Sequence, residues 1–205
     1  APPHTLAPPH TLILSHYKMS QPLVKLCYTL KSFVNNEWNE VILNDKHNLE
    51  EVLTRLYELA STTYAISISN PENEHLNPGY PSHKRESLGP LWKRMSKRPP
   101  EALVLSGIVL YEEDFRELGP IFSSSILKDV KFRYIPFAIG GYHANKALDE
   151  AADAFFKGMR VSTLNSLELC NTPPVFTSKI LGSLGTEPSI KAGDVYRNDL
   201  KYLNI

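Results

Sequence analysis

The sequence predicts an α+β fold in which two main helices pack on a mostly antiparallel sheet, with flexible arms at both ends. Apolar and polar residues alternate in a segment that starts near Leu23, a second strand is expected over Trp38–Leu43, and the Asn35-Asn36 pair between them favours a hairpin turn. Two other segments carry apolar residues at helical spacing. The 16 prolines, above the usual share of about 5%, cluster near both ends and between residues 71 and 100, which indicates loops and arms.

The composition is that of an ordinary globular protein. The apolar fraction is 42%, the charged fraction is 21%, and 22 acidic residues balance 22 basic ones. These values exclude a disordered tail and a uniformly basic nucleic-acid coat. Any binding driven by charge therefore depends on a local cluster.

Residues 1–18 are expected to form an extended arm, because the hexapeptide APPHTL occurs twice in tandem and Pro-Pro pairs favour polyproline II. Met19 is a candidate internal start. The N-terminal residues lack a basic region followed by an apolar one, and no apolar run reaches the roughly 18–20 residues that span a bilayer. We therefore expect no signal peptide, no transmembrane segment and a cytoplasmic location.

Residues 19–170 are predicted to form one domain, which begins with a hairpin. Its strands start at Leu23 and cover Trp38–Leu43. Asn48, three residues before Glu51, has the spacing of a helix N-cap, and apolar spacing predicts a helix over Leu49–Ala60. A third strand is expected over Thr62–Ser69.

The order hairpin, helix, strand resembles a β-grasp half-domain and is similar to the sheet-and-helix lobes of some viral matrix proteins. The resemblance covers about a quarter of the chain and rests on element order. We assign the chain to no family on this basis.

The second half of the domain begins with a long loop over residues 70–100, a length typical of functional or disordered segments. The elements expected after it are a central strand over Glu101–Tyr111, a short helix over Glu112–Leu118 stopped by Gly119-Pro120, an edge or bulged strand over Asp129–Ile139, a helix over Tyr142–Lys157 and a further strand over Met159–Leu169. Residues 171–205, rich in Pro and Gly, are expected to form a C-terminal arm.

The first candidate site is the basic stretch Tyr80–Pro100, which holds six of the 22 Lys and Arg residues against one acid. Cations neutralise phosphates, and an exposed indole stacks on bases or lies at lipid headgroups. The residues predicted to bind a polyanion are Lys84, Arg85, Trp92, Lys93, Arg94, Lys97 and Arg98. The alternative is a solvated loop whose Trp92 and Met95 fold back onto the core.

The second candidate is a turn between a predicted strand and a predicted helix, where backbone N–H groups and the helix dipole favour an anion. Its residues are Gly140, Gly141, Tyr142, His143 and Asn145, with His143 as a general acid or base. A structural turn is the alternative, since the segment matches neither a dinucleotide fingerprint nor a P-loop.

No catalytic residue, cofactor or metal is assigned. No serine lies in a GxSxG motif, and Cys27 and Cys170 lack zinc-site spacing. The two cysteines are expected to be reduced, buried thiols, and one disulfide between them is the alternative.

These patterns favour a non-enzymatic structural or interaction protein that self-associates and binds RNA or an anionic membrane through the basic loop. A viral matrix or capsid-associated protein fits this description, and a protein partner is a further alternative. The alternative function is a small enzyme or ligand-binding domain with an anion site at the Gly140-Gly141 turn.

Overall fold

Seven strands and five helices alternate along the residues that the computed structural model describes, which are 25–44, 48–59, 62–71, 85–135, 146–160, 163–183 and 202–204. The strands are β1 (Cys27–Val34), β2 (Glu37–Leu43), β3 (Thr63–Ser69), β4 (Ala102–Ser106), β5 (Asp129–Arg133), β6 (Ser166–Cys170) and β7 (Tyr202–Asn204). The helices are α1 (Leu49–Glu58), α2 (Gly89–Lys97), α3 (Glu112–Phe122), α4 (Lys146–Arg160) and α5 (Pro174–Ser183).

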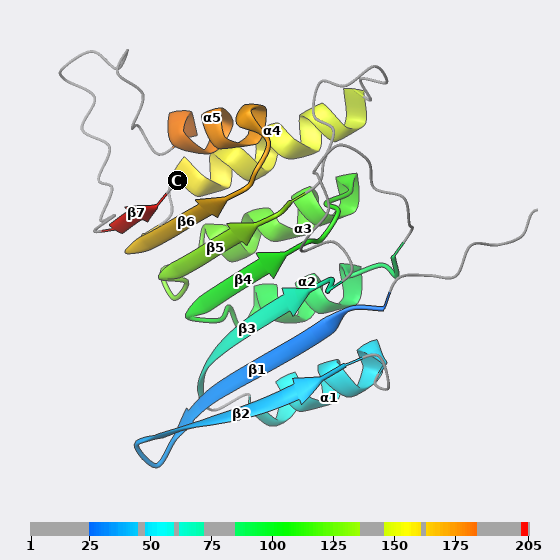
Figure 1. The fold of residues 1–205 in the computed structure, drawn as a ribbon, viewed down its shortest axis with the longest axis vertical. Coiled ribbons are helices and arrows are strands. Elements are labelled where there is room, and N and C mark those ends of the chain that lie inside the picture. The colour runs from blue at the N-terminus through cyan, green and yellow to red at the C-terminus, as the bar shows by residue number, and fades with distance from the viewer. Residues whose placement is uncertain are drawn as a thin grey trace, which may run out of the picture.

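The strands form one mixed sheet in the order β2-β1-β3-β4-β5-β6-β7 (Figure 1). β1 pairs antiparallel with β2 and β3, whereas β3 to β7 are parallel to one another in chain order. The prediction of a mostly antiparallel sheet is therefore wrong, and the fold is α/β. Neighbouring parallel strands need a crossover, and the crossover helices α2 and α5 fall where the sequence predicted loop and arm.

The first elements agree with the sequence. Asn35 and Asn36 both have positive φ, 54° and 66°, as the tight turn of a hairpin with right-handed twist requires. The Asn48 side chain accepts a hydrogen bond from the Glu51 backbone N–H at 3.0 Å and caps α1. The predicted hairpin turn and helix cap are both confirmed.

All five helices lie on one face of the sheet (Figure 1). Alternate strand residues that face them are fully buried, and an aromatic cluster joins β5 to three helices. Phe132 of β5 packs against Phe122 of α3 and Phe176 of α5, and Phe155 of α4 packs edge-on against Phe122. Because each connection between parallel strands crosses with the same hand, successive helices fall on the same side.

The helix count and bounds correct three predictions. α2 lies inside the predicted loop over residues 70–100. α3 continues through Gly119 and Pro120 to Phe122, since Leu118, Ile121 and Phe122 are fully buried and outweigh one missing hydrogen bond in the last turn. The predicted arm 171–205 contains α5 and β7, and β7 pairs with β6. The predicted arm 1–18 lies outside the described residues.

Three successive strands end at a residue with positive φ. Gly107, Tyr134 and Asn171 follow β4, β5 and β6, with φ of 63°, 50° and 51°. This conformation turns the chain out of the strand, so β5 ends at Arg133 instead of continuing to Ile139. β5 is also central, between β4 and β6, and not the edge strand that Pro136 suggested. In the described part of the chain, no helix is long and apolar enough to cross a membrane.

Candidate functional site

Two of the residues predicted to bind a polyanion are buried. Trp92 is 0% exposed and Arg85 is 8% exposed. Trp92 lies on the inner side of α2 with Leu91 and Met95, which are also buried. The expectation that Trp92 is exposed is wrong, and the alternative that it folds back onto the core with Met95 is confirmed.

The buried pair is held by Asp114 of α3. The Asp114 carboxylate forms an ion pair with the Arg85 guanidinium, accepts a hydrogen bond from Trp92 Nε1 at 2.7 Å and accepts another from the Tyr111 backbone N–H at 2.7 Å. Arg85 also donates to the carbonyl oxygens of Val109 at 3.0 Å and Glu86 at 2.8 Å. Burial raises the pKa of the Asp114 carboxyl, while the guanidinium and the indole N–H act against that rise. Arg85 and Trp92 therefore stabilise the contact between α2 and α3, and their polar groups are taken up by these hydrogen bonds.

The other cations of this stretch differ in their surroundings. Lys93 and Lys97 are exposed one turn apart on α2. The Arg94 guanidinium lies over the ring of Tyr57, 5.0 Å from its centroid. Arg98 donates to the Thr62 carbonyl at 2.9 Å. Lys84 lies outside the described residues, so α2 is the part of the predicted polyanion site that the structure presents.

The alternative site, Gly140 to Asn145, also lies outside the described residues. Along the chain it lies between β5, a central parallel strand that ends at Arg133, and α4, which begins at Lys146. Ligands of open α/β sheets bind at the carboxyl ends of the strands. The prediction of an anion or ligand site there stays a prediction.

The sheet face opposite the helices is open to solvent along its middle, and its side chains fall into rows that the strand register fixes. One row runs from Lys31 of β1 through Ala65 of β3 and Ala102 of β4 to Asp129 of β5. The next row holds Ser67 and Val104 over the same two central strands. β3 and β4 therefore form a floor of small side chains along the strand direction.

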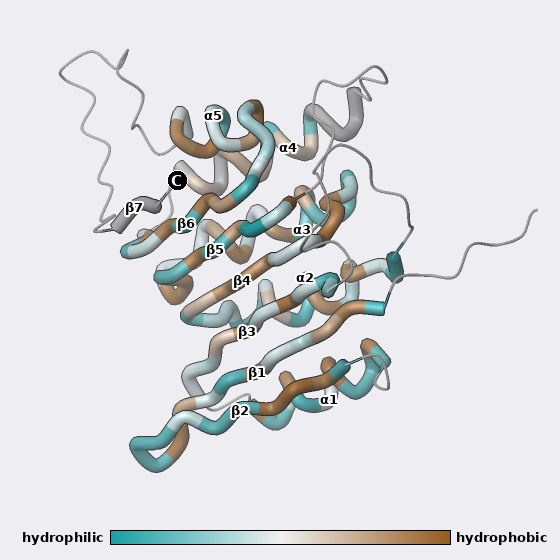
Figure 2. The backbone as a smooth tube through the Cα atoms, viewed as in Figure 1, coloured by the Kyte–Doolittle hydropathy of each residue, from teal (hydrophilic) through white to brown (hydrophobic). Residues whose placement is uncertain are grey.

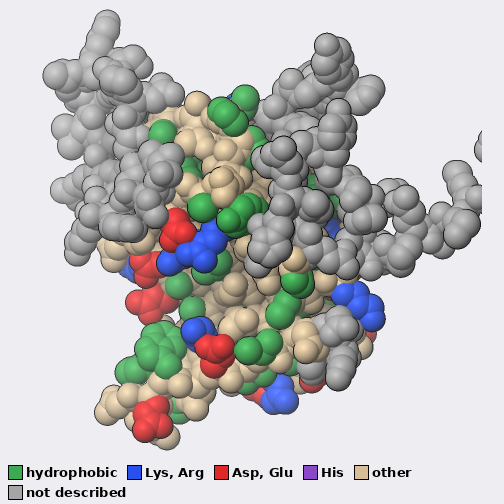
Figure 3. Space-filling model, viewed as in Figure 1, with side chains coloured by type: hydrophobic (Ala, Val, Ile, Leu, Met, Phe, Trp, Pro, Cys, Tyr) green, Lys and Arg blue, Asp and Glu red, His purple; other side chains and the backbone are tan. Residues whose placement is uncertain are grey.

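Charged residues border this floor on both sides. On the β1–β2 side, Lys31 Nζ lies 2.7 Å from a Glu40 carboxylate oxygen. On the β5–β6 side, Glu168 accepts from Arg133 Nε at 2.6 Å and pairs with Lys131 at 3.2 Å. Hydrogen bonds from Arg133 lower the pKa of Glu168. Figure 3 shows these charges as two separate red and blue groups with uncharged surface between them. We call this floor and its two borders the open-face trough.

A hollow of about 500 Å³ lies at the end of the open-face trough nearest the amino ends of β4 and β5. Trp38, 57% exposed, and the Lys31–Glu40 pair line one side, and Glu101 and Asp129 belong to the other. Within the described part of the chain, neither Glu101 nor Asp129 has an ion-pair partner. The hollow therefore combines an aromatic wall with two carboxylates that are available to a ligand.

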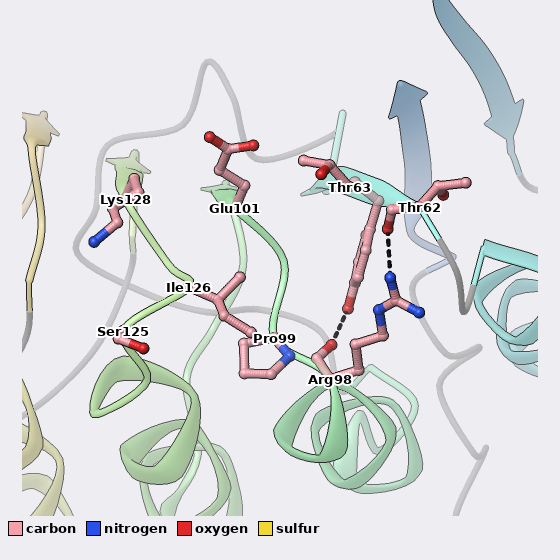
Figure 4. Close-up of a pocket in the computed structure, with 9 residues that line it drawn as sticks. Thr62, Thr63, Arg98, Pro99, Glu101, Ser125, Ile126 and Lys128 are labelled. Atoms are coloured by element: carbon pink, nitrogen blue, oxygen red, sulfur yellow. Dashed lines mark hydrogen bonds between the residues drawn. The ribbon is translucent and has the colours of Figure 1, made fainter. Parts of the chain in front are cut away.

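A second hollow of about 370 Å³ adjoins the first, because Glu101 lines both (Figure 4). Its geometry is fixed by hydrogen bonds from Tyr64 Oη to the Arg98 carbonyl at 2.5 Å and from Arg98 to the Thr62 carbonyl. The Lys128 ammonium does not pair with Glu101, because its Nζ donates to Thr163 Oγ1 at 2.9 Å. Figure 4 shows Glu101 between Lys128 and the Arg98 side, pointing away from both.

The residues of the open-face trough were missed by the sequence analysis. The sequence does place small residues at alternate positions, Ala65 and Ser67 in one segment and Ala102 and Val104 in another. This pattern predicts a shared surface only once β3 and β4 are known to be neighbours. Among the described residues, no group of three or more His, Cys, Asp or Glu side chains is placed to hold a metal. Cys27 and Cys170 are free thiols, each half-buried.

No protein-family model, curated protein or solved structure matches the chain. The functional proposals therefore rest on the geometry of the described residues.

Proposed function

We propose that this protein is a non-enzymatic interaction protein that holds an extended, cationic polypeptide in the open-face trough. The observation that carries the proposal is the hollow lined by Trp38 and by two carboxylates without ion-pair partners among the described residues, Glu101 and Asp129. A guanidinium or ammonium group is the ligand chemistry that this combination favours.

The aromatic wall and the carboxylates both favour cationic groups, on opposite sides of the hollow. A cation over an indole gains about 0.5–1 kcal/mol at an exposed site and more when it is desolvated. A carboxylate adds a charge-assisted hydrogen bond, which is about twice as strong as a neutral one, and arginine can form two in parallel. An arginine side chain therefore fits the hollow better than a lysine does.

The floor of the trough favours an extended chain as the carrier of that cation. Small side chains at Ala65, Ser67 and Ala102 let a second backbone approach the sheet closely. The charges on both borders supply polar groups on either side of the floor.

The test is fluorescence titration with an arginine-containing peptide of about ten residues and with the same peptide carrying citrulline in place of arginine. Trp38 reports on the hollow, because the other tryptophan, Trp92, is buried. The doubly neutralised variant Glu101→Gln/Asp129→Asn should weaken binding of the arginine peptide by about tenfold or more, as expected for two charge-assisted contacts.

The matched control is Glu112→Gln/Glu113→Gln, which removes the same charge from the first turn of α3, away from the trough. This variant should bind like the unmodified protein. Equal affinity for the arginine and citrulline peptides, or an equal loss in both variants, would exclude the hollow as a cation site.

A second candidate function is polyanion binding by α2. It is supported by Lys93 and Lys97, exposed one turn apart and without ion-pair partners among the described residues, and by Arg94 on the same helix. Binding to single-stranded RNA or to anionic vesicles should weaken with salt, and Lys93→Ala/Lys97→Ala should flatten the salt slope. Affinity independent of salt would exclude this function.

A further inference from the structure

The edge strand β2 carries three large apolar side chains that are exposed to solvent. Trp38 and Ile42 are each 57% exposed, and Val41 is 40% exposed. Figure 2 shows the hydrophobic stretch at the carboxyl half of β2. Within the described part of the chain β2 pairs only with β1, so its other side carries backbone N–H and C=O groups with no strand partner there.

Such an edge is a template for another strand, and natural proteins usually protect it with proline, lysine or a bulge. β2 has none of these protections, since its sequence is Glu-Trp-Asn-Glu-Val-Ile-Leu and it pairs with β1 in continuous register over all seven residues. Its central charge, Glu40, is compensated by Lys31 at 2.7 Å.

We propose that β2 pairs antiparallel with β2 of a second copy of this chain, about a two-fold axis that passes through Glu40. This pairing places Trp38 opposite Ile42 of the second copy and Asn39 opposite Val41 of the second copy. It joins the two sheets into one and closes the assembly at a dimer, because a two-fold interface uses the same edge on both copies.

The register follows from the faces of the strand. Trp38, Glu40 and Ile42 share the open face, as their partners Phe33, Lys31 and Thr29 on β1 do. Residues directly opposite each other in an antiparallel pair have side chains on the same face of the sheet. The two-fold axis must therefore lie between one residue and the same residue of the second copy, because an axis between two successive residues would pair side chains of opposite faces.

Of the axes through Asn39, Glu40 and Val41, only the one through Glu40 sets apolar side chains opposite each other on the open face. An axis through Asn39 sets Trp38 opposite Glu40, and an axis through Val41 sets Glu40 opposite Ile42. The axis through Glu40 makes two Trp–Ile contacts. It also sets Glu40 opposite Glu40 of the second copy, and the Lys31 ammonium 2.7 Å from each Glu40 offsets this like charge. Aromatic pairs with β-branched residues are among the favourable cross-strand contacts.

The occupant is a second copy and not a different chain, because β2 is self-complementary in this register. The inference shares Trp38 and the Lys31–Glu40 pair with the proposed cation site, but the variants that test them differ: Ile42 lies on β2 and does not line the hollow, whereas Glu101 and Asp129 lie outside β2.

Disulfide trapping tests the axis directly. In a Cys27→Ser/Cys170→Ser background, Glu40→Cys places two thiols opposite each other, at the Cα separation of about 4.5–5.5 Å that antiparallel strands give and a disulfide accepts. Mild oxidation should convert most of this variant to a covalent dimer. Tyr57→Cys, on α1 at a side chain 70% exposed, should stay monomeric.

Light scattering over a concentration series completes the test without oxidation. The full chain should show a dimer whose dissociation constant rises at least tenfold in Ile42→Lys. Ile126→Lys, which places the same charge at a residue 50% exposed before β5, should leave it unchanged. A monomer at all concentrations, or equal trapping of Glu40→Cys and Tyr57→Cys, would overturn the proposal.

Discussion

The two faces of the sheet are built from alternate residues of the same strands, yet they have different roles. On the helix-covered face, Leu103, Leu105 and Phe132 are fully buried. On the open face, their neighbours Ala102, Val104 and Lys131 keep part of their surface in contact with solvent. One face supplies most of the stability, and the other is left available for binding.

Charged groups follow the same division. In the helix layer, the side chains of Asp114 and Arg85 are nearly inaccessible, and the carboxylate is bound by the Arg85 guanidinium, the Trp92 indole N–H and the Tyr111 backbone N–H. On the open face, Lys31 is 50% exposed in its pair with Glu40, and Glu101 and Asp129 have no ion-pair partner among the described residues. A charge therefore stabilises the fold on one face and is free to meet a ligand on the other.

The largest expected effect is at the buried ion pair. Asp114→Ala removes the acceptor of Arg85 and Trp92 and should lower the free energy of unfolding by about 3–5 kcal/mol, since a buried charge without its partner is costly. Urea unfolding measures the change. Asp153→Ala removes an exposed partner of Lys179 and should cost about 1 kcal/mol at most. Similar costs for the two variants would contradict the distinction between a buried and an exposed ion pair.

Adjacent residues of β4 give the next effect. Leu103→Ala creates a cavity under the helices and should cost about 2–5 kcal/mol. Val104→Ala removes methyl groups from the open face and should cost less than about 1.5 kcal/mol, because little cavity forms. The comparison uses the same denaturation experiment, and a larger cost at Val104 would show that the open face is covered.

The tyrosines of the helix-covered face predict alkaline behaviour. Burial raises the pKa of Tyr28, assisted by Glu86, whose carboxylate accepts its hydroxyl at 2.9 Å, and burial also raises the pKa of Tyr64. The unfolded chain loses these protons near pH 10 while the folded chain keeps them, so stability should fall as the pH rises above about 10.

Ultraviolet absorbance of phenolate checks this expectation. Tyr28 and Tyr64 should ionise together with unfolding and not in the folded chain. The variant Tyr28→Phe identifies the part of the absorbance change that comes from Tyr28. Ionisation of Tyr28 in a fully folded chain would disagree with its burial.

The smallest expected effect belongs to the open face. Because hydrogen bonds from Arg133 lower the pKa of Glu168, their contribution to stability is present above the ordinary pKa of about 4.3 and is lost as the pH falls toward the folded value. Arg133→Gln should raise the pKa of Glu168 in an NMR titration and cost no more than about 1 kcal/mol at pH 7. An unchanged Glu168 pKa would exclude the pair in solution.

The sequence by itself determined the local structure. Alternation defined the strands β1 and β3 and the residues of these strands that point toward the core, because a period of two is a property of the strand alone. Asn35-Asn36 and Asn48 determined a turn and a cap, since both act over at most three residues.

Only the tertiary structure decided which strands are neighbours and in which direction they run, because alternation is the same in parallel and antiparallel strands. It also decided the role of the basic stretch. Arg85 and Trp92 are buried because Asp114, 29 and 22 residues away along the chain, supplies their shared acceptor. Lys93, eight residues after Arg85, has no such partner among the described residues and stays in water. The composition of a segment does not reveal a partner that only folding brings to it.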